Sequence, residues 1–192
     1  MKVLAKNITN LTDARYFASR FVDVMAIPWK GGQQDHELWQ AVKTWIDGVI
    51  WSLEVEHASS DLNSFIKVNN IQHCLVRDNP IAELPEEVHQ WVLVESQSGL
   101  SQLVSSFRHP PRVSIIVTYS WVLSHSKDLE MSNIPVWLEI NSPEEVLKLK
   151  NDSIYVEGIA LTGSPEEETG MKSYEMMDTI FEAIDLSWPE SL

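Results

Sequence analysis

Short apolar runs recur along the whole chain, and longer segments with a helix-like spacing of apolar residues separate them. Most of the runs are rich in Val and Ile, which is typical of parallel strands that are buried on both faces. The pattern therefore predicts eight strands, at residues 3–5, 22–27, 48–53, 73–76, 91–94, 113–117, 135–138 and 158–161.

Several of the intervening segments start with residues that favour the first turn of a helix. Thr12 is a polar residue at the start of a predicted helix that continues to residue 21. Ser142 precedes Pro143 and two glutamates, a sequence that caps a helix and places acids in its first turn. Ser173 precedes the last predicted helix, at residues 174–184, whose apolar face consists of Met177, Ile180, Phe181 and Ile184.

Alternation of strands and helices, repeated eight times, predicts an α/β fold with a parallel sheet. The number of strands favours a (β/α)8 barrel, also called a TIM barrel, with very short connections, because 192 residues is just below the usual minimum of about 200. An open sheet with fewer strands is the structural alternative. No linker or low-complexity tract interrupts the chain, so we expect residues 1–192 to form a single domain.

Composition and charge limit the classes of partner. The formal net charge of −14 argues against nucleic acid and against an anionic membrane surface, because both need clustered Lys and Arg. A small anionic ligand then requires a local positive site, and protein partners stay open. With Cys74 as its one cysteine, the chain has no internal disulfide. No apolar run has the length of a membrane span or a signal peptide, so we expect a cytoplasmic protein.

Both ends of the chain carry motifs that resemble one enzyme family. Residues 6–14 read Lys-Asn-Ile-Thr-Asn-Leu-Thr-Asp-Ala, and residues 158–166 read Gly-Ile-Ala-Leu-Thr-Gly-Ser-Pro-Glu, followed by Gly-Met-Lys at 170–172. The order and spacing are similar to the first and last βα units of phosphoribosylanthranilate isomerases, the (β/α)8 enzymes of tryptophan biosynthesis. Between residues 26 and 107 the resemblance is limited to the strand–helix rhythm.

The resemblance implies a site at the carboxyl ends of the strands, where barrel enzymes keep their active sites. The family performs an Amadori rearrangement, an aldose–ketose isomerisation, with a cysteine base after the first strand and an aspartate acid after the sixth. The substrate phosphate binds backbone amides after the seventh and eighth strands.

The residues at the implied catalytic positions differ from the family pattern. Lys6 stands in the place of the cysteine, and an ammonium with an ordinary pKa of about 10.4 is no base near neutral pH unless it is desolvated. The sixth strand ends in Val117 and Thr118, with no carboxylate at the place of the acid, and Tyr119 is a poor substitute. In the loop after the seventh strand, Glu139 and Ile140 replace glycines, and Glu139 repels a phosphate.

Other residues at the expected mouth remain candidates for binding. Asn7 follows Lys6, and Lys30 is the cation nearest the place of an arginine in the family. The segment Thr162, Gly163 and Ser164 either offers amides and hydroxyls to an anion or forms a tight turn. No spacing indicates a metal site, because His73 and Cys74 are adjacent and face opposite sides of a strand, and we expect no cofactor.

Charged residues near the same mouth need partners when they are buried. We expect Lys6 to pair with Glu139 or Glu95, and Arg77 to pair with Glu54. Such a network either forms a new site or fills the inherited one.

Three functions follow from the sequence. The first is a divergent barrel of this family that has lost the isomerase reaction and acts as a binding or scaffold protein, or performs another reaction. The second is an active phosphoribosylanthranilate isomerase with substitute residues. The third is a different sugar-phosphate enzyme built around Lys6.

Overall fold

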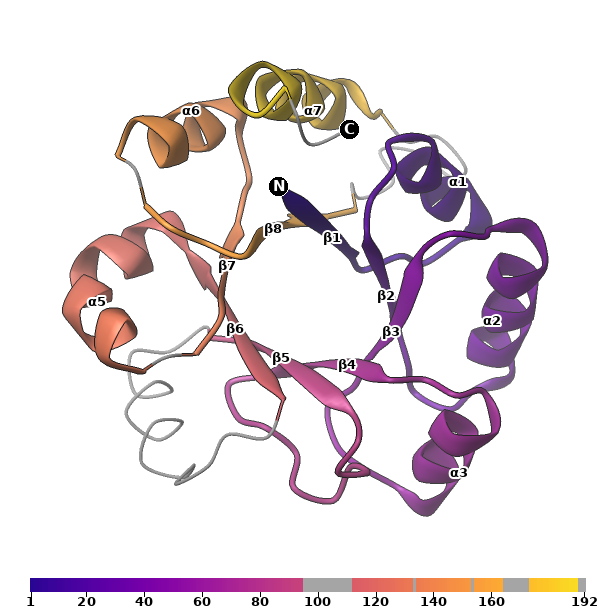
Figure 1. Ribbon diagram of the computed structural model, residues 1–192. Helices are drawn as coiled ribbons and strands as arrows, with labels where there is room; N and C mark the ends of the chain where they lie inside the picture. The colour runs from indigo at the N-terminus through magenta and orange to yellow at the C-terminus, as the bar shows by residue number, and fades with distance from the viewer. Residues whose placement is uncertain (95–111, 133, 153, 164–172, 190–192) are drawn as a thin grey trace.

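Eight parallel strands form a closed barrel in the computed structural model, which describes residues 1–94, 112–132, 134–152, 154–163 and 173–189. Each strand pairs with the next, and the last pairs with the first (Figure 1). All eight predicted strands are confirmed, and so is the (β/α)8 barrel. The strands are β1 Lys2–Lys6, β2 Val24–Pro28, β3 Ile50–Glu54, β4 His73–Arg77, β5 His89–Leu93, β6 Val113–Thr118, β7 Val136–Glu139 and β8 Gly158–Thr162.

Helices surround the barrel, and α7 lies between α6 and α1 in this outer ring (Figure 1). The predicted start of the first helix at Thr12 is wrong. Its N-cap is Asn10, whose side chain accepts a hydrogen bond of 2.9 Å from the amide of Asp13, so Thr12 lies within the first turn. The helices are α1 Leu11–Ser19, α2 Gln33–Trp45, α3 Ser60–Val68, α5 Tyr119–Ser132, α6 Pro143–Asn151 and α7 Glu175–Ser187.

Alternate residues of each strand face the inside of the barrel or the helices, which produces two apolar layers. The outer layer includes Phe17, Leu53 and Cys74, and lies between strands and helices. The inner layer is closed by the rings of Trp91 and Trp137, whose centroids are 5.8 Å apart. A Cβ atom at Gly158 would lie 2.5 Å from the Trp137 ring, so the absence of a side chain there makes room for the indole.

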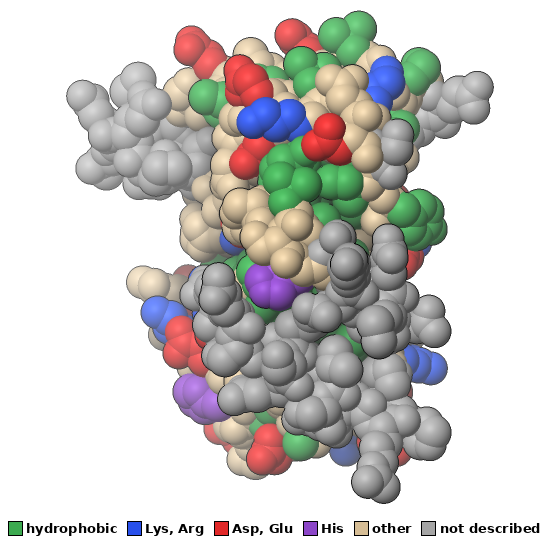
Figure 2. Space-filling model, turned by 90° about the vertical axis from the view of Figure 1, so that its left-hand side faces the viewer, with side chains coloured by type: hydrophobic (Ala, Val, Ile, Leu, Met, Phe, Trp, Pro, Cys, Tyr) green, Lys and Arg blue, Asp and Glu red, His purple; other side chains and the backbone are tan. Residues whose placement is uncertain are grey.

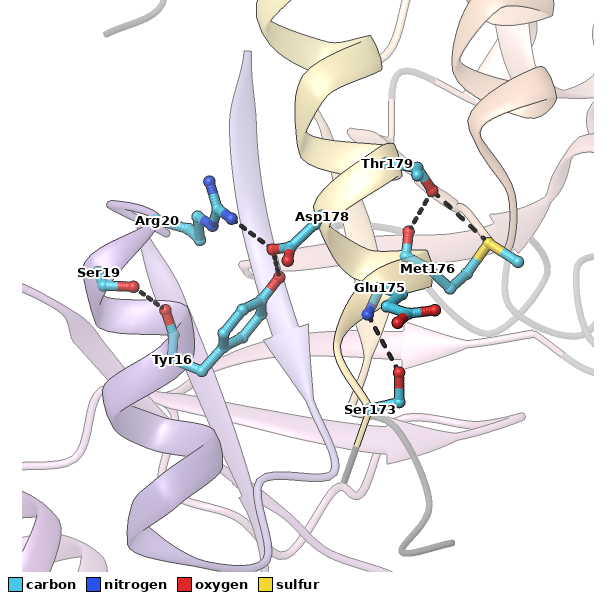
Figure 3. Close-up of polar contacts among 8 residues, drawn as sticks. All are labelled: Tyr16, Ser19, Arg20, Ser173, Glu175, Met176, Asp178 and Thr179. Atoms are coloured by element: carbon cyan, nitrogen blue, oxygen red, sulfur yellow. Dashed lines mark hydrogen bonds and ion pairs between the residues drawn. The ribbon is translucent and has the colours of Figure 1, made fainter. Parts of the chain in front are cut away.

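Contacts between α1 and α7 join the two ends of the chain. Figure 3 shows the hydroxyl of Tyr16, on α1, and the guanidinium of Arg20, the residue after α1, directed at the carboxylate of Asp178 on α7. The rings of Tyr16 and Tyr174 stack with their centroids 3.9 Å apart. The Tyr174 hydroxyl donates to the buried carboxylate of Asp13 over 2.7 Å. The last helix is thereby fixed to the first.

On the surface over α5 and α6, acidic, basic and apolar side chains are interspersed, and neither sign of charge forms a continuous patch in that view (Figure 2). None of the helices in the described part of the chain has the length and apolar character that a membrane crossing requires.

Candidate functional site

The carboxyl ends of the strands place a set of charged and polar side chains at one mouth of the barrel. Lys6 is two residues beyond Leu4, an inner-layer residue, and therefore faces the same side of β1. The same alternation relates Arg77 to Leu75 and Glu139 to Trp137. The sequence-based expectation that the chemistry-bearing residues gather at this mouth thus agrees with the strand geometry.

An ion pair between Lys6 and Glu139 joins the carboxyl ends of β1 and β7 at this mouth. The Nζ atom of Lys6 is 2.9 Å from Oε1 of Glu139, and the two side chains are only 10% and 16% exposed. The hydroxyl of Thr162, on the strand between them, donates to the same carboxylate oxygen over 3.4 Å. One of the two partners expected for Lys6 is therefore the observed one, whereas Glu95 lies outside the described residues.

Three backbone amides after β7 and β8 in the described part of the chain, which could hold a phosphate, are bonded within the protein. The amide of Ile140 donates to the carbonyl of Ala160 over 3.0 Å, and the amide of Asn141 donates to the Glu145 carboxylate over 2.7 Å. The amide of Gly163 donates to the carbonyl of Lys6 over 3.0 Å. An anion at this place would have to displace these bonds and would also meet the Glu139 carboxylate.

At the end of β6, where the family resemblance implies an aspartate, the structure has the hydroxyl of Thr118. Thr118 pairs in register with Glu139, and its Oγ1 lies 3.2 Å from the Ser120 hydroxyl. Tyr119 is directed away from the mouth, because its hydroxyl donates to Asp152 at the end of α6. The described part of β6 and the start of α5 therefore supply no carboxylate to the mouth.

Glu54 is a half-buried carboxylate at the end of β3. It accepts a hydrogen bond from the amide of Asn7, a residue with a positive φ of 58°. Burial raises the pKa of Glu54 above its ordinary value, although the Asn7 amide and the positive charges of Lys6 and Arg77 act against this rise. The expected ion pair of Arg77 with Glu54 stays a prediction, and the structure gives only an effect of the Arg77 charge on this carboxylate.

A cavity of about 1060 Å³ opens beside Glu54, over the carboxyl ends of β2, β3 and β4. Its polar wall includes Asn7, Lys30 and Arg77, and its apolar wall includes Leu62 and Phe65 of α3. Such a volume can accommodate a small molecule, since ligand sites typically measure about 300–1,000 Å³.

The predicted site residues therefore divide into two groups. Lys6, Glu139, Thr162 and Gly163 lie together around the ion pair, and Asn7 and Lys30 line the cavity. The backbone at Gly163 packs closely against the backbone of Asn7, because a Cβ atom at Gly163 would lie 3.1 Å from the carbonyl oxygen of Asn7. Gly163 therefore serves this contact and does not form an open anion site. Ser164 lies outside the described residues.

The sequence did not reveal the position of the cavity. Trp29 stacks on Phe65 with ring centroids 4.0 Å apart, and the His36 ring meets the edge of this pair. This aromatic contact between the end of β2 and two helices forms one side of the cavity. The sequence did place a charged residue at the end of each of two neighbouring strands, Glu54 on β3 and Arg77 on β4, and this pattern could have indicated a polar wall there.

No protein-family model matches the sequence, and no curated protein matches it. Solved structures do match. A phosphoribosylanthranilate isomerase in complex with reduced 1-(o-carboxyphenylamino)-1-deoxyribulose 5-phosphate has a TM-score of 0.72 at 13% identity, covering 95% of this chain and 97% of that one. The isomerase from Pyrococcus furiosus has a TM-score of 0.65 at 15% identity, covering 97% and 99%.

The likeness extends to barrels with other roles. A spore coat polysaccharide biosynthesis protein from Bacillus subtilis has a TM-score of 0.65 at 10% identity, covering 98% of this chain and 67% of that one. At these identities the matches show a shared barrel fold, and chemistry has to be argued from the site.

Proposed function

We propose that this chain is a divergent relative of the phosphoribosylanthranilate isomerases, and that its mouth binds a small molecule without performing the inherited isomerisation. The motifs at both ends of the sequence and the near-complete coverage of isomerase structures support the relationship. The observation that carries the loss of the reaction is the ion pair of Lys6 with Glu139, at the two positions where the family would place its base and begin its phosphate loop.

The ion pair opposes each part of the inherited reaction. The Nζ atom of Lys6 lies 2.9 Å from the Glu139 carboxylate, so the group at the place of the base is already engaged in an ion pair. Glu139 repels a phosphate at the loop, and the amides of Asn141 and Gly163 already have acceptors. The sugar-phosphate ligand expected from the resemblance therefore finds little support on this side of the mouth.

The test is an isomerase assay on the purified chain with phosphoribosylanthranilate, with an active isomerase such as the one from Pyrococcus furiosus as the positive control. We expect no turnover above the uncatalysed rate, and no rescue of a tryptophan auxotroph that lacks the enzyme. Turnover that depends on Lys6 or Glu139 would contradict the proposal and would favour an active isomerase with substitute residues.

An enzyme built around Lys6 is the remaining alternative. Its Nζ atom would have to leave the ion pair with Glu139 to attack a carbonyl. Borohydride trapping with carbonyl substrates is therefore expected to leave Lys6 unmodified. Trapping at Lys6 in the parent chain would overturn the binding function.

A further inference from the structure

Three buried polar atoms inside the barrel have no hydrogen-bond partner among the described residues. They are the hydroxyl oxygen of Ser52, Nδ1 of His73 and the indole Nε1 of Trp91. Ser52 is 0% exposed and Trp91 is 4% exposed, so neither side chain is solvated from outside. Burial of a polar atom without a partner is costly, and such atoms in folded proteins are normally satisfied by a bound water molecule or a ligand.

The three side chains lie on consecutive strands and face the inside of the barrel. Ser52 is in register with Ala26, a residue of the inner layer, and with His73 on the next strand. His73 is two residues before Leu75, another residue of the inner layer, so its ring faces inward as well. On the other side of β4, the Trp91 ring stacks on the His73 ring at an interplanar angle of 19°. His73 therefore lies between the other two side chains.

This polar region is separated from the charged mouth and reaches the surface at the other end of the barrel. The rings of Trp91 and Trp137 meet edge to face on the mouth side of it, since Trp137 is two residues before Glu139 on β7. His73 and His89 begin their strands and are only partly buried. A small molecule can therefore enter from the amino-terminal end of the barrel, between the two histidine rings and the solvent.

The hydrogen-bonding chemistry of the three atoms fits a water molecule. An indole N–H only donates, whereas a hydroxyl donates and accepts and a neutral imidazole nitrogen does either. A water can accept from Trp91 and donate to His73 or Ser52, which provides the two to four polar partners that a buried water requires. The charges that act on the two histidines are those of Arg112 and Glu157, and their opposite signs favour a neutral occupant over an ion.

We propose that the barrel binds an ordered internal water at its amino-terminal end, held by the Trp91 indole, Nδ1 of His73 and the Ser52 hydroxyl. The water joins β3, β4 and β5 inside the barrel, where these three side chains make no hydrogen bond to one another. It thereby satisfies polar atoms that would otherwise weaken the interior. The site is remote from the charged mouth, so it does not depend on the proposed function.

Nuclear magnetic resonance on the isotope-labelled full chain tests the proposal directly. We expect the indole proton of Trp91, assigned with the variant Trp91→Phe, to show a nuclear Overhauser cross-peak to water, with the sign of a water that tumbles with the protein. The indole of Trp39 is the matched control, because it donates to Oδ1 of Asn69 over 3.0 Å and should show no such cross-peak. Absence of the cross-peak at Trp91 would overturn the proposal.

The stability of Ser52→Ala provides a second measurement, in which the sign of the effect is decisive. A hydroxyl that binds the water contributes to stability, so its removal should lower the melting temperature by about 2–4 °C. A hydroxyl without any partner is costly, so its removal would leave the melting temperature unchanged or raise it, and this result would contradict the site. Ser64→Ala, at an exposed position of α3, is the control and should not lower the melting temperature.

Discussion

Lys6 and Glu139 illustrate how two substitutions can depend on each other. Each alone would place a nearly buried charge at the barrel mouth, and such a charge is costly without a partner. Together they form an ion pair to which Thr162 adds a hydrogen bond. The pair therefore stabilises the mouth in the same place where it opposes the isomerase chemistry.

The stability of single variants should reveal this dependence. Glu139→Gln leaves the Lys6 ammonium without its partner, and we expect it to lower the free energy of unfolding by about 2–3 kcal/mol, somewhat below the roughly 3–5 kcal/mol of a fully buried pair. Urea unfolding followed by circular dichroism measures the change. Adding Lys6→Met to this variant should restore part of the loss, since it removes the unpaired charge.

The pair of Lys2 with Glu157, at the other end of β1, provides the matched control. Its atoms are 2.8 Å apart, but the side chains are 57% and 37% exposed. Glu157→Gln should therefore change the free energy of unfolding by less than about 1 kcal/mol. Equal effects of Glu139→Gln and Glu157→Gln would mean that the pair of Lys6 and Glu139 has no special role in stability.

At the scale of elements, the residues that match the family motifs close the barrel. Asp13, from the first motif, accepts a hydrogen bond from Tyr174, which precedes α7. Gly163, from the last motif, bonds the Lys6 carbonyl and allows the close approach to Asn7. The motifs thus correspond to the junction of the first and last βα units, and their resemblance concerns architecture more than catalysis.

Two tyrosines at this junction are expected to differ in their contribution to stability. The Tyr174 hydroxyl donates to Asp13, which is 0% exposed, whereas the Tyr16 hydroxyl donates to Asp178, whose side chain is 41% exposed and also binds Arg20. Tyr174→Phe should lower the free energy of unfolding by about 1.5–3 kcal/mol and Tyr16→Phe by about 0.5–1 kcal/mol. Thermal and urea unfolding of both variants check the order, and a reversed order would contradict it.

The strands were predictable from the sequence because each is buried on both faces and reads as an apolar run. The start of α1 was less predictable, since Asn10 and Thr12 both belong to residue types that favour the N-cap position. The choice between them depends on which residue has the extended backbone conformation of an N-cap, and in the structure it is Asn10. The contact of Glu54 with the Asn7 amide depends on a positive φ at Asn7, which local sequence does not specify. The cavity depends on the stacking of Trp29 with Phe65, a long-range contact.

At the scale of the whole molecule, the opposite end of the barrel carries two histidines at the starts of neighbouring strands. His73 and His89 begin β4 and β5 and are in register with each other, and His73 is also in register with Ser52 of β3. The His89 Nε2 atom lies 3.0 Å from the Ser114 hydroxyl, and the His73 ring stacks on Trp91 with centroids 4.8 Å apart. Burial lowers the pKa of His73 to about 4, with the charges of His89 and Arg112 adding to the effect, and burial also lowers the pKa of His89.

These lowered pKa values predict a loss of stability in acid. The unfolded chain takes up a proton at His73 near the ordinary pKa of about 6.5, whereas the folded chain does so only near 4. Between these values the unfolded state binds more protons than the folded state. The contribution of His73 to the free energy of unfolding is therefore complete above about pH 6.5 and is lost progressively as the pH falls to about 4. His89 acts in the same direction.

The variant His73→Phe keeps a ring against Trp91 but removes the titration. Its free energy of unfolding, measured in urea at intervals from pH 7 to pH 4.5, should fall less steeply with acid than that of the parent. The 28 acidic residues of the chain also titrate, but they are common to both proteins and cancel in the difference. His57→Gln, in the exposed loop after β3, should follow the parent curve. Parallel curves for His73→Phe and the parent would show that His73 takes up its proton equally well in the folded barrel, and the acid sensitivity would then have to arise elsewhere.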